Sequence, residues 1–131
     1  MSSFLPIKML VYGTLMQGYS NHYLIEGCKF LGRARTVQKF GLFVADYPFV
    51  SSIVKETQII GEVYEVTHTD QLFKLDELEG HPDYYLRSDV DIVMEDCLEN
   101  FQAQIYFNDK YSTTDSEYVS SGHFKDSKSS Q

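Results

Sequence analysis

Two short stretches of the sequence combine residue types that could bind and convert a ligand. The first is Tyr12-Gly13-Thr14-Leu15, which follows an apolar run beginning at Ile7. Backbone N–H groups at a glycine turn before a helix can form a nest for an anion such as a carboxylate. Gly13 would permit close approach of a ligand, and Thr14 adds a hydroxyl. The alternative is a plain strand-to-helix connection, and the stretch lacks the G-x-x-x-x-G-K-[ST] pattern of a phosphate loop.

The second stretch is LDELEG, residues 75–80, in which Glu79 directly precedes the glycine. A carboxylate in the last turn of a helix lies beside unpaired carbonyls, and burial beneath Tyr84 and Tyr85 would desolvate it. Both effects raise a carboxyl pKa, so that the group can accept a proton and later return it. The alternative is that Glu79 is simply exposed, as we expect for Asp76 and Glu77.

Other kinds of catalytic centre find no support in the residue pattern. The histidines are dispersed and have no metal-ligand spacing. No G-x-S-x-G elbow occurs, and neither Cys28 nor Cys97 has a base beside it. We expect both cysteines to be reduced and buried or half-buried. The sequence therefore predicts a site without a metal, a cofactor or a covalent nucleophile.

These candidate residues must be positioned by strands and two short helices. Alternation of apolar and polar residues predicts strands at 7–12, 32–46, 58–66, 84–94 and 101–107. A first helix is expected at 20–28, with Ser20 or Asn21 as its cap and Gly27 at its end. The pattern lacks a βαβ rhythm and predicts an α+β fold with a curled or barrel-like sheet.

The second helix is expected at 69–80, immediately before the second candidate stretch. Leu72, Leu75 and Leu78 lie on one face of it, and Gly80 provides the C-terminal stop. This helix would carry Glu79 in its last turn.

Length and composition limit the class of protein. The chain of 131 residues is 43% hydrophobic and 15% aromatic, which fits one domain, expected at 1–124, with a disordered tail at 125–131. A net charge of −8 argues against nucleic-acid or anionic-membrane partners. The chain has neither a signal-peptide pattern nor an apolar run of ~20 residues, so we expect a cytoplasmic protein with a small-molecule partner. Its oligomeric state is not indicated.

Four segments together resemble one known family. VYGTL at 11–15, GRARTVQKF at 32–40, GEVYEV at 61–66 and LDELEGHPDYYLR at 75–87 are similar in order and spacing to the gamma-glutamylcyclotransferase-like family. The arrangement most resembles the gamma-glutamylamine cyclotransferases. This resemblance implies a small mixed β-barrel with flanking short helices. It spans about residues 7–124.

The resemblance also implies where the site lies. The substrate-binding residues would be Tyr12, Gly13, Thr14 and Leu15, and the catalytic acid/base would be Glu79. Further pocket members are expected at Tyr85 and, through a looser match of EYVSSGHF, at Tyr118 and Ser121; the loop at 45–50 would border the pocket.

The implied reaction needs no cofactor. The α-amine of a γ-glutamyl amide attacks its own side-chain carbonyl and releases 5-oxoproline and a free amine. Two alternatives stay open: a binding module of the same fold that recognises γ-glutamyl groups or a protein partner, and an enzyme for glutathione or γ-glutamyl amino acids.

Overall fold

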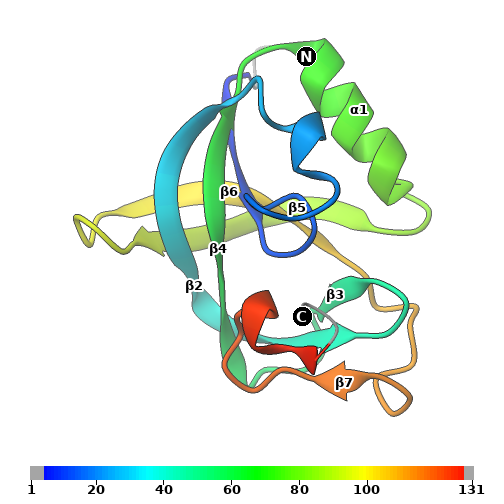
Figure 1. Ribbon diagram of the computed structural model, residues 1–131. Coiled ribbons are helices and arrows are strands. Elements are labelled where there is room, and N and C mark those ends of the chain that lie inside the picture. Colours follow the sequence, from blue (N-terminus) through cyan, green and yellow to red (C-terminus); the bar gives the residue numbers. More distant parts are fainter. Residues whose placement is uncertain (1–4, 129–131) are drawn as a thin grey trace.

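The chain folds into a closed, mixed β-barrel (Figure 1). The computed structural model describes residues 5–128, and within them five strands form the barrel in the order β1–β4–β2–β5–β6. Four of the five pairings are antiparallel, whereas β1 and β6 are parallel. These strands are β1 (Ile7–Val11), β2 (Lys29–Val44), β4 (Thr57–Val66), β5 (Leu86–Met94) and β6 (Asn100–Phe107). The expected α+β barrel is confirmed.

Closure of the barrel depends on the long strand β2. Its first half pairs with both β4 and β5, and its register against β4 shifts between Arg35 and Lys39. Thr36 stabilises this bulge, because its hydroxyl accepts the Ile59 N–H at 2.9 Å and donates to the Gln38 carbonyl at 2.6 Å. The bend directs the second half of β2 into a small sheet with β3 (Pro48–Ser51) and β7 (Glu117–Tyr118). The sequence pattern missed both of these short strands.

The single α-helix of the described residues, α1 (Thr69–Glu79), covers one end of the barrel (Figure 1). Gly80 follows it in the left-handed conformation, with φ of 67°. The Gly80 N–H bonds the Glu77 carbonyl and the His81 N–H bonds the Asp76 carbonyl, a Schellman arrangement. The predicted helix and its glycine stop are confirmed, but on the expected apolar face only Leu75 is fully buried.

The expected helix at 20–28 does not form, and this prediction is wrong. A single 3-10 turn, η2 (His22–Leu24), lies there. Asn21 does not cap a helix; its side chain donates to Thr14 Oγ1 at 2.8 Å, and its N–H bonds the Thr14 carbonyl. His22 Nδ1 lies 2.9 Å from the Leu15 carbonyl. These side chains bind the preceding loop instead of supporting an α-helix.

The C-terminal segment packs against the barrel. Gly122 follows β7, and its carbonyl accepts a hydrogen bond from the Ile60 N–H of β4 at 2.9 Å. Phe124 then begins the 3-10 turn η3 (Phe124–Asp126). Ser127 is buried and Lys128 N–H bonds Glu117, so the structure differs from the expected disorder over 125–128; residues 129–131 lie outside the described residues. No described helix is long and apolar enough to cross a membrane.

Candidate active site

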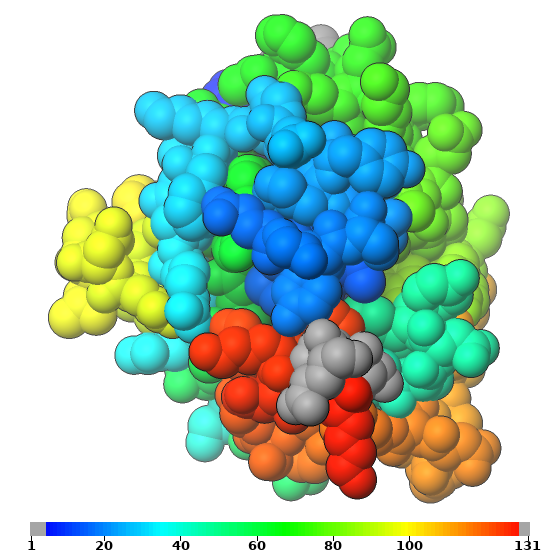
Figure 2. All heavy atoms as spheres, viewed as in Figure 1, coloured from blue at the N-terminus to red at the C-terminus, as the bar shows by residue number. Residues whose placement is uncertain are grey.

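A cavity of about 210 Å³ opens where three segments meet: the chain after β1, the β2–β3 connection and the end of α1 with the residues that follow. The lining residues are Leu10, Val11, Tyr12, Gly13, Thr14, Leu15, Asn21, Tyr47, Pro48, Leu78, Glu79, Tyr84, Tyr85 and Tyr106. Figure 2 shows the segment that follows β1, in blue, between the C-terminal residues in red and the green residues around α1.

Residues 12–15, which we call the site loop, turn sharply at the end of β1. The turn is closed by Met16 N–H, which donates to the Gly13 carbonyl at 3.0 Å. Within residues 5–128, the N–H groups of Gly13, Thr14 and Leu15 donate to no other residue. Asn21 fixes the loop from behind through its two bonds to Thr14. The loop therefore presents free donors beside the cavity, although no α-helix follows it.

Gly13 is required at its position because the first residue of β3 lies against it. A Cβ placed on Gly13 would be only 2.6 Å from Pro48 Cγ. Pro48 is in turn tied to the opposite wall, since Tyr85 Oη donates to the Pro48 carbonyl at 2.8 Å. One contact and one hydrogen bond thus connect the site loop, β3 and the segment after α1.

Glu79 is the last residue of α1 and is partly buried in the cavity wall. Burial raises the pKa of its carboxyl from 4.5 to about 7. Three carbonyls of the last turn of the helix accept hydrogen bonds: that of Asp76 from the His81 N–H, that of Glu77 from the Gly80 N–H, and that of Glu79 from the Tyr85 N–H at 3.0 Å. Desolvation by burial, rather than the helix terminus, is the cause of the raised pKa.

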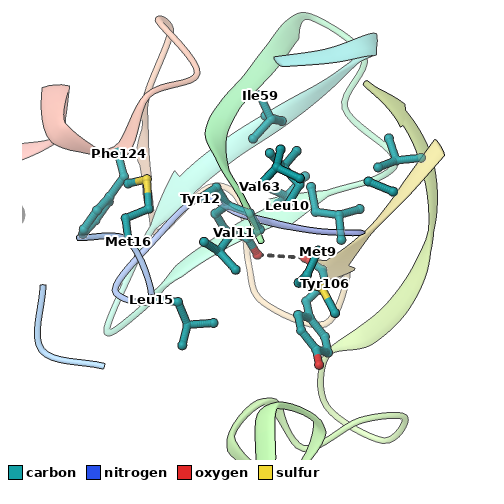
Figure 3. Packing of buried hydrophobic residues seen from close by; sticks show 14 of the residues in the cluster. Met9, Leu10, Val11, Tyr12, Leu15, Met16, Ile59, Val63, Tyr106 and Phe124 are labelled. Atoms are coloured by element: carbon teal, nitrogen blue, oxygen red, sulfur yellow. Dashed lines mark hydrogen bonds between the residues drawn. The ribbon is translucent and has the colours of Figure 1, made fainter. Parts of the chain in front are cut away.

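Three tyrosines share the surroundings of this carboxyl. Burial raises the pKa of Tyr12, Tyr85 and Tyr106, and the charge of Glu79 adds to the rise in each case. Tyr12 Oη also donates to the Tyr106 carbonyl at 2.8 Å (Figure 3). Glu79 therefore lies in an aromatic environment in which the protonated and ionised forms are close in free energy near neutral pH.

The structure brings six of the eight expected site residues to this cavity: Tyr12, Gly13, Thr14, Leu15, Glu79 and Tyr85. The other two lie elsewhere. Tyr118 is in β7, where its hydroxyl contacts Thr57 and its ring packs on Phe43. Ser121 donates to Asp126 at 2.7 Å. Both contacts belong to the packing of the C-terminal segment.

Several lining residues were not expected from the sequence. The sequence pattern predicts Asn21 as a helix cap and Tyr106 as an ordinary strand residue, and no local pattern distinguishes either as a cavity residue. Leu78 was assigned to the buried helix face, yet it is 41% exposed and lines the cavity. Tyr47 and Pro48 belong to the 45–50 loop, which was expected to border the pocket.

Two further expectations need correction. Asp76 does not face solvent: its side chain is 19% exposed and accepts hydrogen bonds from Arg87 and Tyr106. Cys28 is buried, but Cys97 is exposed in the turn between β5 and β6; both are free thiols.

Among residues 5–128, no group of three His, Cys, Asp or Glu side chains could hold a metal ion.

The fold and the site together define a class of small enzyme-like domains: a barrel in which a glycine loop and a partly buried glutamate face one cavity. Comparison with known proteins identifies this class. The family described as gamma-glutamyl cyclotransferase, AIG2-like, matches residues 9–126. This chain belongs to that family.

Individual relatives agree with this assignment. A Methanocaldococcus jannaschii protein provisionally named a gamma-glutamylcyclotransferase is 39% identical over 119 residues, 90% of this chain and 95% of that protein. The Bos taurus gamma-glutamylaminecyclotransferase is 31% identical over 112 residues, 79% of this chain and 66% of the relative. The crystal structure of a Mus musculus AIG2-like protein superposes with a TM-score of 0.83 at 25% identity, covering 95% of this chain and 92% of that one. The relatives' names support an enzymatic, gamma-glutamylcyclotransferase function.

Proposed function

We propose that this protein is a cyclotransferase that acts on γ-glutamyl amides. The substrate's α-amine attacks the side-chain carbonyl, a C–N bond of a five-membered lactam forms, and the original amide C–N bond breaks. The ammonium begins with three hydrogens: one stays on the lactam nitrogen, and two end on the released amine, which leaves as R–NH₃⁺. The products are 5-oxoproline and that amine.

The observation that carries the proposal is the position of Glu79 in the cavity wall with a pKa of about 7. An acid/base catalyst is most effective when its pKa lies near the working pH. Ionised Glu79 would take a proton from the substrate ammonium, because the amine can attack the carbonyl only after it has lost that proton. The protonated carboxyl would then deliver that proton to the leaving nitrogen. After the amine attacks, the carboxylate would take the second proton from the ring nitrogen and pass it to the released amine.

The site loop would bind the substrate and stabilise the developing charge. The free N–H groups at residues 13–15 are donors of the kind that stabilise an oxyanion. Because nucleophile and carbonyl belong to one molecule, catalysis mainly requires a folded substrate conformation, and a cavity of about 210 Å³ restricts the conformations available.

For the leaving group we propose an amine rather than an amino acid linked through its α-nitrogen. The name of the Bos taurus relative supports this choice. Tyr47 and Tyr84 are 59% and 42% exposed in the cavity wall, and they would contact the leaving group at the mouth.

The test is to incubate the purified protein with a panel of γ-glutamyl amines, γ-glutamyl amino acids and glutathione, and to measure 5-oxoproline. Glu79→Gln should reduce kcat on the order of 10²–10⁴-fold and keep product binding, because the site loop is unchanged. Glu77→Gln, which changes an exposed neighbour on the same helix, is the matched control and should have the parent rate.

Binding of γ-glutamyl amides without 5-oxoproline would instead support the binding-module alternative. Turnover by Glu79→Gln at the parent rate would exclude Glu79 as the acid/base.

A further inference from the structure

Beside the cavity, side chains from two strands, β5 and β6, meet at the carboxylate of Asp76 in α1. Arg87 donates to it through Nε at 2.9 Å and Nη2 at 3.1 Å, and Tyr106 donates through its hydroxyl at 2.6 Å. The Asp76 and Arg87 side chains are each only 19% exposed. We call these three residues the Asp76–Arg87–Tyr106 cluster.

The cluster joins the end of α1 to the barrel. Asp76 lies three residues before Glu79, so the two carboxylates are on the same side of the helix. Arg87 is in β5, and its backbone N–H donates at 3.0 Å to Nδ1 of His81, the residue that completes the helix cap. The last turn of α1 is therefore attached to β5 through both a side chain and a cap residue.

Tyr106 extends this attachment to the other side of the cavity. Tyr106 is one of the lining residues; its hydroxyl donates to Asp76, and its carbonyl accepts the hydrogen bond from Tyr12 (Figure 3). A single residue of β6 thus contacts both the helix that carries Glu79 and the first residue of the site loop.

We propose that the residues of the Asp76–Arg87–Tyr106 cluster are positioning residues, which hold the Glu79 carboxyl at a fixed position relative to the site loop. This inference rests on the proposed role of Glu79 as the acid/base. A partly buried ion pair contributes little net stability compared with apolar packing of similar volume. Hydrogen bonds from two strands to one carboxylate instead specify position and orientation, which the reaction needs.

Tyr106→Phe is the first test, because it removes one hydroxyl and preserves the ring, the carbonyl and all formal charges. We expect kcat to fall on the order of 10- to 100-fold, as for a misplaced catalytic group, with KM within about twofold of the parent. Asp76→Asn should have a similar effect, and the double variant should lose less than the product of the two single losses, because both changes break the same hydrogen bond.

Glu95→Gln is the matched control. It disrupts the other ion pair of the described residues, Arg33–Glu95 at 3.7 Å, and should leave kcat and KM unchanged.

A second readout does not depend on turnover. Carbon-13 NMR titration of the Glu79 carboxyl should give a lower pKa in Tyr106→Phe than in the parent, because a loosened helix end admits water. Tyr12 and Tyr85, the other tyrosines whose pKa values Glu79 raises, are unchanged in this variant. Parent kcat together with a parent titration curve in Tyr106→Phe would overturn the positioning role. Absence of 5-oxoproline from the parent protein would overturn the proposed function, while the titration would still test the cluster.

Discussion

Glu79 illustrates how burial alone can prepare a carboxyl group for proton transfer. The group ends a capped helix, lies among three tyrosines and has a pKa raised by desolvation to about 7. Since its folded-state pKa exceeds the ordinary 4.5, the protonated form is favoured in the folded protein. Its contribution to stability is fully present below pH 4.5 and is lost as the pH rises through about 7.

The upward direction of the Glu79 pKa shift gives a prediction in which activity and stability change in opposite directions with pH. The kcat/KM of the parent should rise with pH through about 7, because the base must be ionised. At pH 8.5, Glu79→Gln should be more stable than the parent by roughly 1–3 kcal/mol, and near pH 4 the two should be equal. Rate measurements and urea unfolding at both pH values check this. A Glu79→Gln protein less stable than the parent at pH 8.5 would contradict the burial argument.

The elements around the cavity are held against one another by a few close contacts rather than by a large interface. The site loop meets the start of β3 where Gly13 has no Cβ, and Pro48 occupies the adjacent space. Pro48 is also bonded to Tyr85 in the segment after α1. A displacement at one of these points therefore reaches the whole cavity wall.

Gly13→Ala should accordingly affect substrate binding and stability together. The new Cβ must displace the Pro48 ring, and overpacking of this kind costs about 1–3 kcal/mol. We expect KM to rise about tenfold, equivalent to about 1.4 kcal/mol of lost binding. Gly27→Ala is the control, because its Cβ would make only an ordinary 3.5 Å contact with Gln71. Parent KM and melting temperature in Gly13→Ala would show that Pro48 does not constrain the loop.

At the scale of the whole molecule, the C-terminal segment packs against the stretch that follows the site loop. Phe124 is 4% exposed, its ring lies 5.1 Å from that of Tyr19, and Figure 3 shows it beside Met16. Met16 and Tyr19 belong to the stretch that follows the site loop. Apolar packing thus joins the C-terminal segment to the stretch that follows the site loop.

Phe124→Ala should destabilise the protein by about 3–5 kcal/mol, the usual cost of removing a buried phenylalanine. Phe73→Ala is the matched control, because Phe73 is 66% exposed on α1 and its loss should change stability by less than about 0.5 kcal/mol. Urea unfolding of both variants measures the difference. Equal midpoints for the two would mean that the C-terminal segment is not part of the cooperative unit.

The sequence by itself determined the features that local patterns encode. The helix from Thr69 to its glycine stop and the five barrel strands follow from periodicity and from the left-handed conformation that Gly80 adopts. These signals are local, because each depends on neighbours within a few positions along the chain. Glu79 and the site loop could be selected as candidates for the same reason.

Only the tertiary structure decided which side chains complete the site. Asp76 and Tyr106 are 30 positions apart and meet because α1 packs over the end of a closed barrel, while Tyr118, selected from sequence, is held by β2 and Thr57 instead. Asn21 is a partner of the site loop because its side chain bonds Thr14 Oγ1 and makes no helix-capping hydrogen bond. Such choices depend on strand register, barrel closure and competition between hydrogen-bond partners, which are properties of the whole chain rather than of any segment.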